Sequence, residues 1–261
     1  MNWSEQDCLD LRKARELLEN VSTGIRILET LGLPVQKGIE KLPDGLQKKV
    51  VKVTNDALHK TIEIALKTLD KTETNIPSQD TLHKLLAVLF GALGGAAGFT
   101  GLAVELPITT ILIMRSILDI ARSEGEDLAD PNVLIEAIEV FALGGNSNRD
   151  DEAEISYYTI RTALAASVQE ASAYLISNTT IDESAPVILR FIQKIAERYS
   201  IQVSEKYIAQ VLPIAGGVGG AAINHTFINH FQKIARGHFI IRRLEKKYGA
   251  DSVRKMYLNG C

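Results

Sequence analysis

The chain has 261 residues, a formal net charge of −3, 46% hydrophobic residues and few aromatic ones. This length allows one large domain or two small ones with a hydrophobic core, and the composition excludes general disorder. Abundant alanine, leucine and isoleucine favour helices over a β-sandwich or a barrel.

The two cysteines, Cys8 and Cys261, give neither a disulfide framework nor the spacing of a metal site. We therefore expect a reduced, cytoplasmic setting. The N-terminal segment is acidic and polar, so no signal peptide is expected there.

The N-terminal segment predicts a helix that begins at a capping signal, Ser4 followed three residues later by Asp7. A long amphipathic helix follows, with apolar residues at helical spacing from Val50 to Leu69. The polar stretch over 71–80 is the best candidate boundary. We therefore expect an N-terminal helical arm over 1–75, a helical core over 76–250 and a tail over 251–261, or one continuous domain over about 5–250.

The expected core begins with an uncharged run over 85–104. A break is predicted at Glu105–Pro107, because proline removes a backbone donor, and a helix is predicted over 108–122. An acidic turn over 123–131 then leads into another helix, with Pro131 in its first turn.

Further helices are predicted after the loop over 143–151, from Val187 to about Tyr199, and over 207–248 with an interruption near Pro213. No segment shows the period-two alternation of a strand. The predicted fold class is therefore all-α: a multi-helix bundle in which two glycine-rich apolar helices pack centrally.

Those two helices carry glycines at a spacing of four, which places them on one helical face and lets another backbone approach closely. The residues are Gly91, Gly94, Gly95, Gly98, Gly216 and Gly220. A phosphate-binding loop would need a preceding strand and a lysine signature, and neither is present. A buried packing helix is the favoured interpretation, with a membrane span or reversible insertion as alternatives, because 85–104 is long enough to cross a bilayer.

Charge is distributed unevenly along the chain. The segment over 119–154 contains eleven acids and two arginines, whereas the segment over 233–255 contains eight bases and two acids. Either the two regions neutralise each other, or the basic end contacts phosphate groups of lipid or nucleic acid. The candidate anion or lipid contacts are Arg236, Arg242, Arg243, Lys246 and Lys247.

The histidines of the C-terminal segment lie five and eight residues apart, at His225, His230 and His238, which is not the spacing of a metal pair on one helix. A helical wheel places His230 and His238 with apolar residues and His225 opposite them. Catalytic residues are not assigned, and no metal and no cofactor are expected.

A wider polar cluster is a candidate site. Its members are Glu105, Arg115, Asp119, Asn224, His230, Arg236 and His238. A half-buried pair between Glu105 and an arginine is favoured over a catalytic carboxylate, which would need a second titratable group at a defined distance.

Two blocks of sequence, "GGAAGFTGLAVELPITTILIMRSILDIARSEGEDLADP" over 94–131 and "LPIAGGVGGAAINHTFINHFQKIARGHFIIRRLEKKYG" over 212–249, resemble the EcsC family of bacterial proteins. The resemblance implies no established enzymatic activity, although some relatives are labelled peptidases. The positions that match the family pattern are Glu105, Pro107, Arg115, Asn224, His230, Arg236, His238, Arg242 and Arg243.

These observations favour a non-enzymatic helical protein of uncharacterised role that associates with an anionic membrane surface or a membrane-protein partner. The alternative is a hydrolase-type enzyme whose pocket brings together Glu105, His230 and His238. A scaffold that packs against itself or another protein is a third hypothesis, so a homo-oligomer is allowed. A nucleic-acid partner is not expected, because the basic end lacks interleaved aromatic residues.

Overall fold

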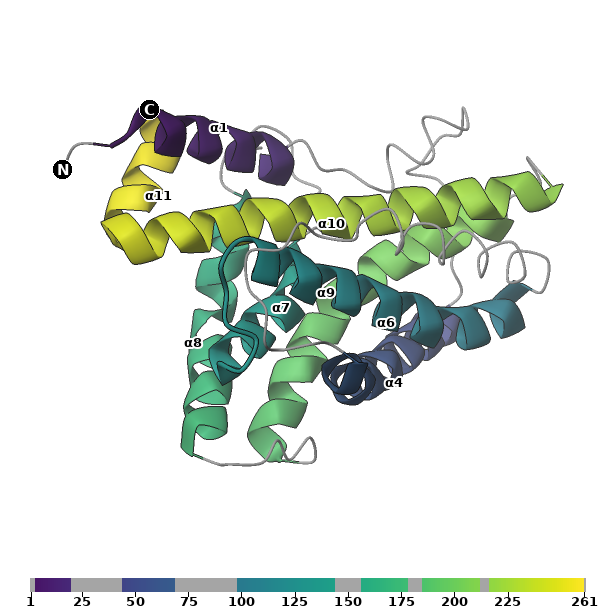
Figure 1. The fold of residues 1–261 in the computed structure, drawn as a ribbon. Helices are drawn as coiled ribbons and strands as arrows, with labels where there is room; N and C mark the ends of the chain where they lie inside the picture. Colours follow the sequence, from purple (N-terminus) through teal and green to yellow (C-terminus); the bar gives the residue numbers. More distant parts are fainter. Residues whose placement is uncertain are drawn as a thin grey trace.

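The computed structural model describes residues 3–19, 44–68, 98–143, 156–177, 185–211 and 216–260. These residues form eight α-helices, and no strand occurs within the described ranges (Figure 1). The helices are α1 (Glu5–Glu19), α4 (Asp44–Thr68), α6 (Gly98–Ser123), α7 (Pro131–Leu143), α8 (Ser156–Ser177), α9 (Pro186–Val211), α10 (Gly216–Tyr248) and α11 (Ala250–Asn259). The predicted all-α class is confirmed.

Local helix signals in the sequence are confirmed as well. The Asp7 backbone N–H donates to Ser4 Oγ at 3.1 Å, and the Ser4 hydroxyl donates to Asp7 Oδ2 at 2.5 Å, so Ser4 caps α1. Pro131 is the first residue of α7, and the carboxylate of Asp130 accepts the Asn132 N–H at 2.9 Å.

The break predicted at Glu105–Pro107 is wrong, because α6 continues through Pro107. An interior proline costs about 3 kcal/mol. Leu106 before it and Thr109 and Thr110 after it are fully buried. We infer that packing on both sides of the proline outweighs this cost and keeps α6 helical through Pro107.

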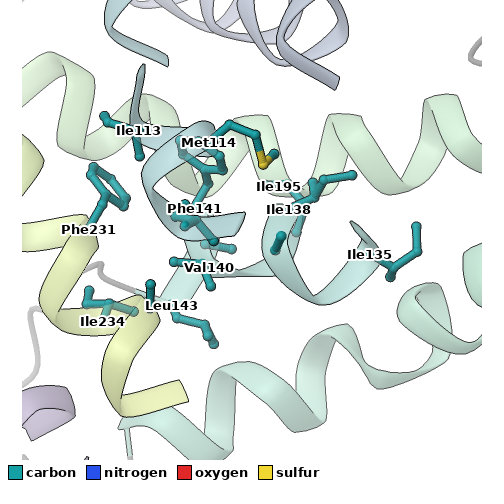
Figure 2. Close-up of a cluster of buried hydrophobic side chains, with 14 of the residues drawn as sticks. Ile113, Met114, Ile135, Ile138, Val140, Phe141, Leu143, Ile195, Phe231 and Ile234 are labelled. Carbon is teal, nitrogen blue, oxygen red and sulfur yellow. The ribbon is translucent and has the colours of Figure 1, made fainter. Parts of the chain in front are cut away.

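The centre of the bundle is α7, whose residues from Val133 to Leu143 are all buried. Figure 2 shows side chains from α6, α9 and α10 gathered around it, with Phe141 near Met114 of α6. The Phe141 ring lies 4.8 Å from the Tyr199 ring of α9 and 5.4 Å from the Phe231 ring of α10, measured between centroids. Such a helix, apolar on nearly all sides, needs protein on all sides.

The longest element is α10, whose 33 residues run along one side of the bundle (Figure 1). Its inward face is apolar, with Phe227, Phe231 and Ile234 buried, and it includes the buried His230 and His238. His225 lies on the exposed side. The helical wheel predicted from the sequence is therefore confirmed.

On its other side α10 carries α1, which lies along its C-terminal half (Figure 1). The Trp3 ring stacks on the Tyr248 ring with centroids 4.2 Å apart. Farther along, Gly237 of α10 lies against α1: a Cβ added there would be 2.7 Å from Leu18 Cγ and 3.1 Å from the Ala14 carbonyl oxygen. The absence of a side chain at Gly237 therefore sets the distance between the two helices.

The glycines predicted to mediate central packing lie mostly beyond what the structure describes. Gly91, Gly94 and Gly95 are outside the described residues. Gly98 lies at the start of α6, and Gly216 and Gly220 lie at the start of α10, but the side-chain packing of these two helix starts is not among the described features. No helix in the described part of the chain combines the length and hydrophobicity needed to cross a bilayer.

The expectation that the two cysteines form no disulfide is wrong. Cys8 of α1 is disulfide-bonded, and the chain's other cysteine, Cys261, lies outside the described residues. Disulfides are rare in reducing compartments. The cysteines therefore do not support the expected reduced, cytoplasmic setting.

Replacing Gly237 with alanine should lower the free energy of unfolding by about 1–3 kcal/mol, because the new methyl group forces α1 away from α10. Urea unfolding followed by circular dichroism measures this change. Gly45→Ala is the matched control, since a Cβ at this helical position meets nothing within 4 Å. That control should be neutral or stabilising by up to about 1 kcal/mol. Equal effects of the two substitutions would contradict the proposed close contact.

Candidate functional site

The candidate site begins with two acids on the buried helix α7. Glu136 and Glu139 are three residues apart and so share one face of the helix. Glu136 is 9% exposed and Glu139 only 2%. Buried carboxylates are tolerated only with charged or hydrogen-bonding partners, so the neighbouring helices must supply them.

One partner is His238 of α10, which is completely buried. Its Nε2 lies 3.0 Å from Glu136 Oε2, and its Nδ1 lies 2.9 Å from the hydroxyl of Tyr157, at the start of α8. Burial lowers the pKa of His238 and outweighs the opposing effect of Glu136, so the ring is neutral at neutral pH. Burial also raises the pKa of Tyr157 well above its ordinary value. The partners therefore assign a tautomer in which Nε2–H donates to Glu136 and the Tyr157 hydroxyl donates to Nδ1.

Two arginines complete the surroundings of the acids. Arg242 Nη1 lies 2.5 Å from Glu136 Oε1, and Arg242 Nε lies 3.4 Å from Glu126 Oε1. Arg161 of α8 forms a two-pronged pair with Glu245 at 2.7 and 3.1 Å. Each guanidinium thus has a carboxylate partner, and both lie close enough to influence the α7 acids.

Glu126 reaches this network from a turn whose geometry follows from one glycine. Gly125 has a φ of 90°, which glycine adopts without strain. The Glu126 N–H donates to the Ala121 carbonyl and the Gly125 N–H to the Arg122 carbonyl, both at 3.0 Å, as in a Schellman motif. This C-cap ends α6 and places Glu126, 1% exposed, against α10.

The two α7 carboxyls have opposite pKa shifts. Burial and the charge of Glu136 raise the pKa of Glu139 to about 8. Burial also opposes ionisation of Glu136, but the hydrogen bond from His238 and the charges of Arg242 and Arg161 lower its pKa to about 2. At neutral pH the pair therefore holds one carboxylate and one carboxylic acid, an arrangement in which a proton is shared between coupled groups.

Another acid–base feature of the interior is an ion pair between Glu105 of α6 and Lys206 of α9. Lys206 Nζ lies 2.6 Å from Glu105 Oε1, and both side chains are almost completely buried. The ammonium also lies 4.9 Å from the centre of the Phe227 ring. Burial lowers the pKa of Lys206, and Glu105 opposes this shift. Glu105 therefore pairs with a lysine, whereas the sequence predicted an arginine, and this pair is fully rather than half buried.

The structure relates one member of the polar cluster predicted from the sequence to this site, and the cluster as a whole stays a prediction. Of its seven members, only His238 belongs to the Glu136–Glu139 site. His230 lies eight residues away along α10, or about 12 Å. Among the other members, Glu105 pairs with Lys206, Asp119 with Arg122 and Arg236 with Glu124. Arg115 is half-buried on α6, and Asn224 is buried in α10.

The basic C-terminal residues meet acids of the chain itself. The pairs are Arg236–Glu124, Arg242–Glu126, Arg242–Glu136, Arg243–Asp10, Arg243–Glu124, Lys246–Glu126 and Lys247–Asp7. The interpretation that acidic and basic regions neutralise each other is therefore supported for these five cations. The acids come from α1, α7 and the turn after α6.

The chain matches the EcsC protein family over residues 19–244 and belongs to that family. No curated protein and no solved structure matches it. The match covers α4, α6, α7, α8, α9 and most of α10, and therefore includes Glu136, Glu139 and His238.

Replacing Glu139 with glutamine should change how stability depends on pH. The folded chain keeps a proton on Glu139 up to about pH 8, whereas an unfolded glutamic acid loses it near pH 4.3, so the wild-type free energy of unfolding falls as pH rises between these values. Glutamine carries no titrating proton, so the variant should lose this part of the slope and gain stability relative to wild type near pH 9.

Urea unfolding over this pH range, with a chelator present, measures the slope. Glu170→Gln, at an exposed position of α8, is the matched control and should follow the wild-type curve. Parallel curves for Glu139→Gln and wild type would show that Glu139 is ionised in the folded protein.

Proposed function

We propose that this EcsC family protein is a non-enzymatic helical protein that attaches to the periphery of a membrane. The proposed contact surface is the outer face of α8 together with the start of α9. The observation that carries this proposal is the scarcity of charge on the outer face of α8.

In its 22 residues α8 has only two charged side chains, Arg161 and Glu170. Arg161 turns toward Glu245 of α10, which leaves Glu170 as the one charge on the outer face. The other exposed residues are small or uncharged: Thr159, Thr162, Ala163, Ala165, Ala166, Gln169, Ala173, Ile176 and Ser177. A contiguous face of this kind is typical of an interaction surface.

The end of this face also exposes large apolar side chains. Ile176, in the last turn of α8, is 66% exposed, and Leu189, in the first turn of α9, is 41% exposed. Figure 1 shows the end of α8 and the start of α9 at the same end of the bundle. Peripheral binding strengthens with the apolar area that enters the interface, and this end supplies such area.

The basic end of α10 has a smaller part in this proposal than the sequence indicated. Acids of the chain pair with Arg236, Arg242 and Arg243 and compete with lipid phosphate for them. Lys246 and Lys247 also have acid partners, but their side chains are more than half exposed, so they can add an electrostatic contribution with anionic lipids.

The alternative, a hydrolase-type pocket built from Glu105, His230 and His238, gains no support from the geometry. Glu105 pairs with Lys206, and His238 pairs with Glu136 and Tyr157. His230 is separated from His238 by about two turns of α10. We therefore do not assign an enzymatic role to these residues.

Flotation of the purified chain with phosphatidylcholine vesicles, with and without phosphatidylglycerol, tests the proposal. The wild type should float with both kinds of vesicle, more strongly with the anionic ones. Ile176→Asp should weaken binding about tenfold, because roughly 1.5 kcal/mol of apolar burial is lost.

Ile201→Asp is the matched control, since Ile201 is 50% exposed on α9 and lies away from the α8–α9 end. This variant should float like the wild type. A wild-type chain that stays at the bottom of the gradient with both vesicles, or an Ile176→Asp variant that floats unchanged, would refute the proposal.

A further inference from the structure

We propose that Glu136, Glu139 and His238 bind a divalent transition-metal ion. The two carboxylates would each supply one oxygen and the imidazole would supply Nε2. This inference is independent of membrane attachment, because it concerns the interior of the bundle between α7 and α10.

The first argument is distance. One candidate ligand atom from each of the three side chains lies within 4.8 Å of the other two. Metal–ligand bonds of about 2.0–2.2 Å place the ligand atoms of one ion about 3–4 Å apart. Small rotations of the glutamate side chains are therefore enough to close the set around an ion.

The second argument is that groups outside the set hold two of the ligands in place. Tyr157 lies 2.9 Å from His238 Nδ1 and leaves Nε2 directed at the acids. On metal binding the imidazole proton would move from Nε2 to Nδ1 and be donated to the Tyr157 oxygen. Arg242 holds Glu136 Oε1 at 2.5 Å, which leaves Oε2 for the ion. Such outer partners accompany metal ligands in proteins because they fix ring orientation and carboxylate geometry.

The third argument is charge. The charged groups that face one another here are four acids and three bases: Glu126, Glu136, Glu139 and Glu245 against Arg161, Arg242 and Lys246. With every carboxylate ionised, the network has one negative charge in excess. A bound divalent cation offsets that charge, and the nearby guanidiniums moderate its affinity.

The donor set selects the class of ion. One imidazole nitrogen with two carboxylate oxygens suits Zn²⁺, Co²⁺, Mn²⁺ or Fe²⁺, whereas Mg²⁺ and Ca²⁺ prefer oxygen ligands alone. The Glu136 side chain retains 12% exposure, so the edge of the set is accessible from the surface.

Titration of the chelator-treated full chain with Zn²⁺ in a calorimeter tests this proposal. The wild type should bind one equivalent, and Glu139→Gln should weaken binding at least about tenfold. Asp10→Asn, which removes a carboxylate from the α1–α10 contact, is the control and should bind like the wild type. Circular dichroism establishes that each variant is folded.

Titration with Co²⁺ gives a second readout that needs no variant. Visible absorption bands of a low-coordinate Co²⁺ ion should appear and saturate at one equivalent, and Zn²⁺ should abolish them. A wild-type chain that shows no such bands and binds no Zn²⁺ would overturn the proposal. So would a folded Glu139→Gln variant whose Zn²⁺ affinity equals that of wild type, because the ion would then be bound elsewhere.

Discussion

The cations on the C-terminal half of α10 must be balanced where the helix meets the rest of the bundle, and this requirement organises the structure. An unpaired guanidinium at a packed interface is costly, so acids have to arrive from other elements. They come from α1, from the turn after α6 and from α7. Each of these elements is thereby fixed relative to α10, in addition to the contacts between apolar side chains.

The same requirement explains how α7 can be fully buried and still carry two acids. Glu136 is compensated by Arg242 and His238, whereas burial and the charge of Glu136 keep the proton on Glu139 near neutral pH. Among the described groups around these two acids there is therefore one carboxyl group more than the cations neutralise. A proton on Glu139 balances this extra carboxyl group in the isolated chain. A divalent metal ion, as proposed above, could take the place of that proton, because the ligand atoms lie close enough together.

Much of the fold follows from local sequence signals, but most of the site does not. The Ser4 cap, Pro131 at the start of α7 and the inward face of α10 were all predictable, because each depends on neighbours within a few residues. The contact between Glu136 and His238 spans 102 positions, and no single-helix spacing indicates it. A usable signal did exist: two glutamates three residues apart in an otherwise uncharged apolar helix indicate buried acids that need partners.

The predictions that failed share a physical reason. The continuity of α6 through Pro107 depends on tertiary packing, and the choice of Lys206 as partner of Glu105 depends on how α9 crosses α6. Neither depends on the local sequence.

A double-mutant cycle between Arg242 and Glu136 tests most directly whether the acid–base contacts of α10 hold the bundle together. The unfolding free energies of Arg242→Met, Glu136→Gln and the double variant are compared with that of the wild type. Each single substitution should destabilise the fold, and the double variant should recover about 1–3 kcal/mol relative to their sum. A coupling energy of zero would mean that this most buried arginine–carboxylate contact of α10 with α7 does not stabilise the structure, which would contradict the account.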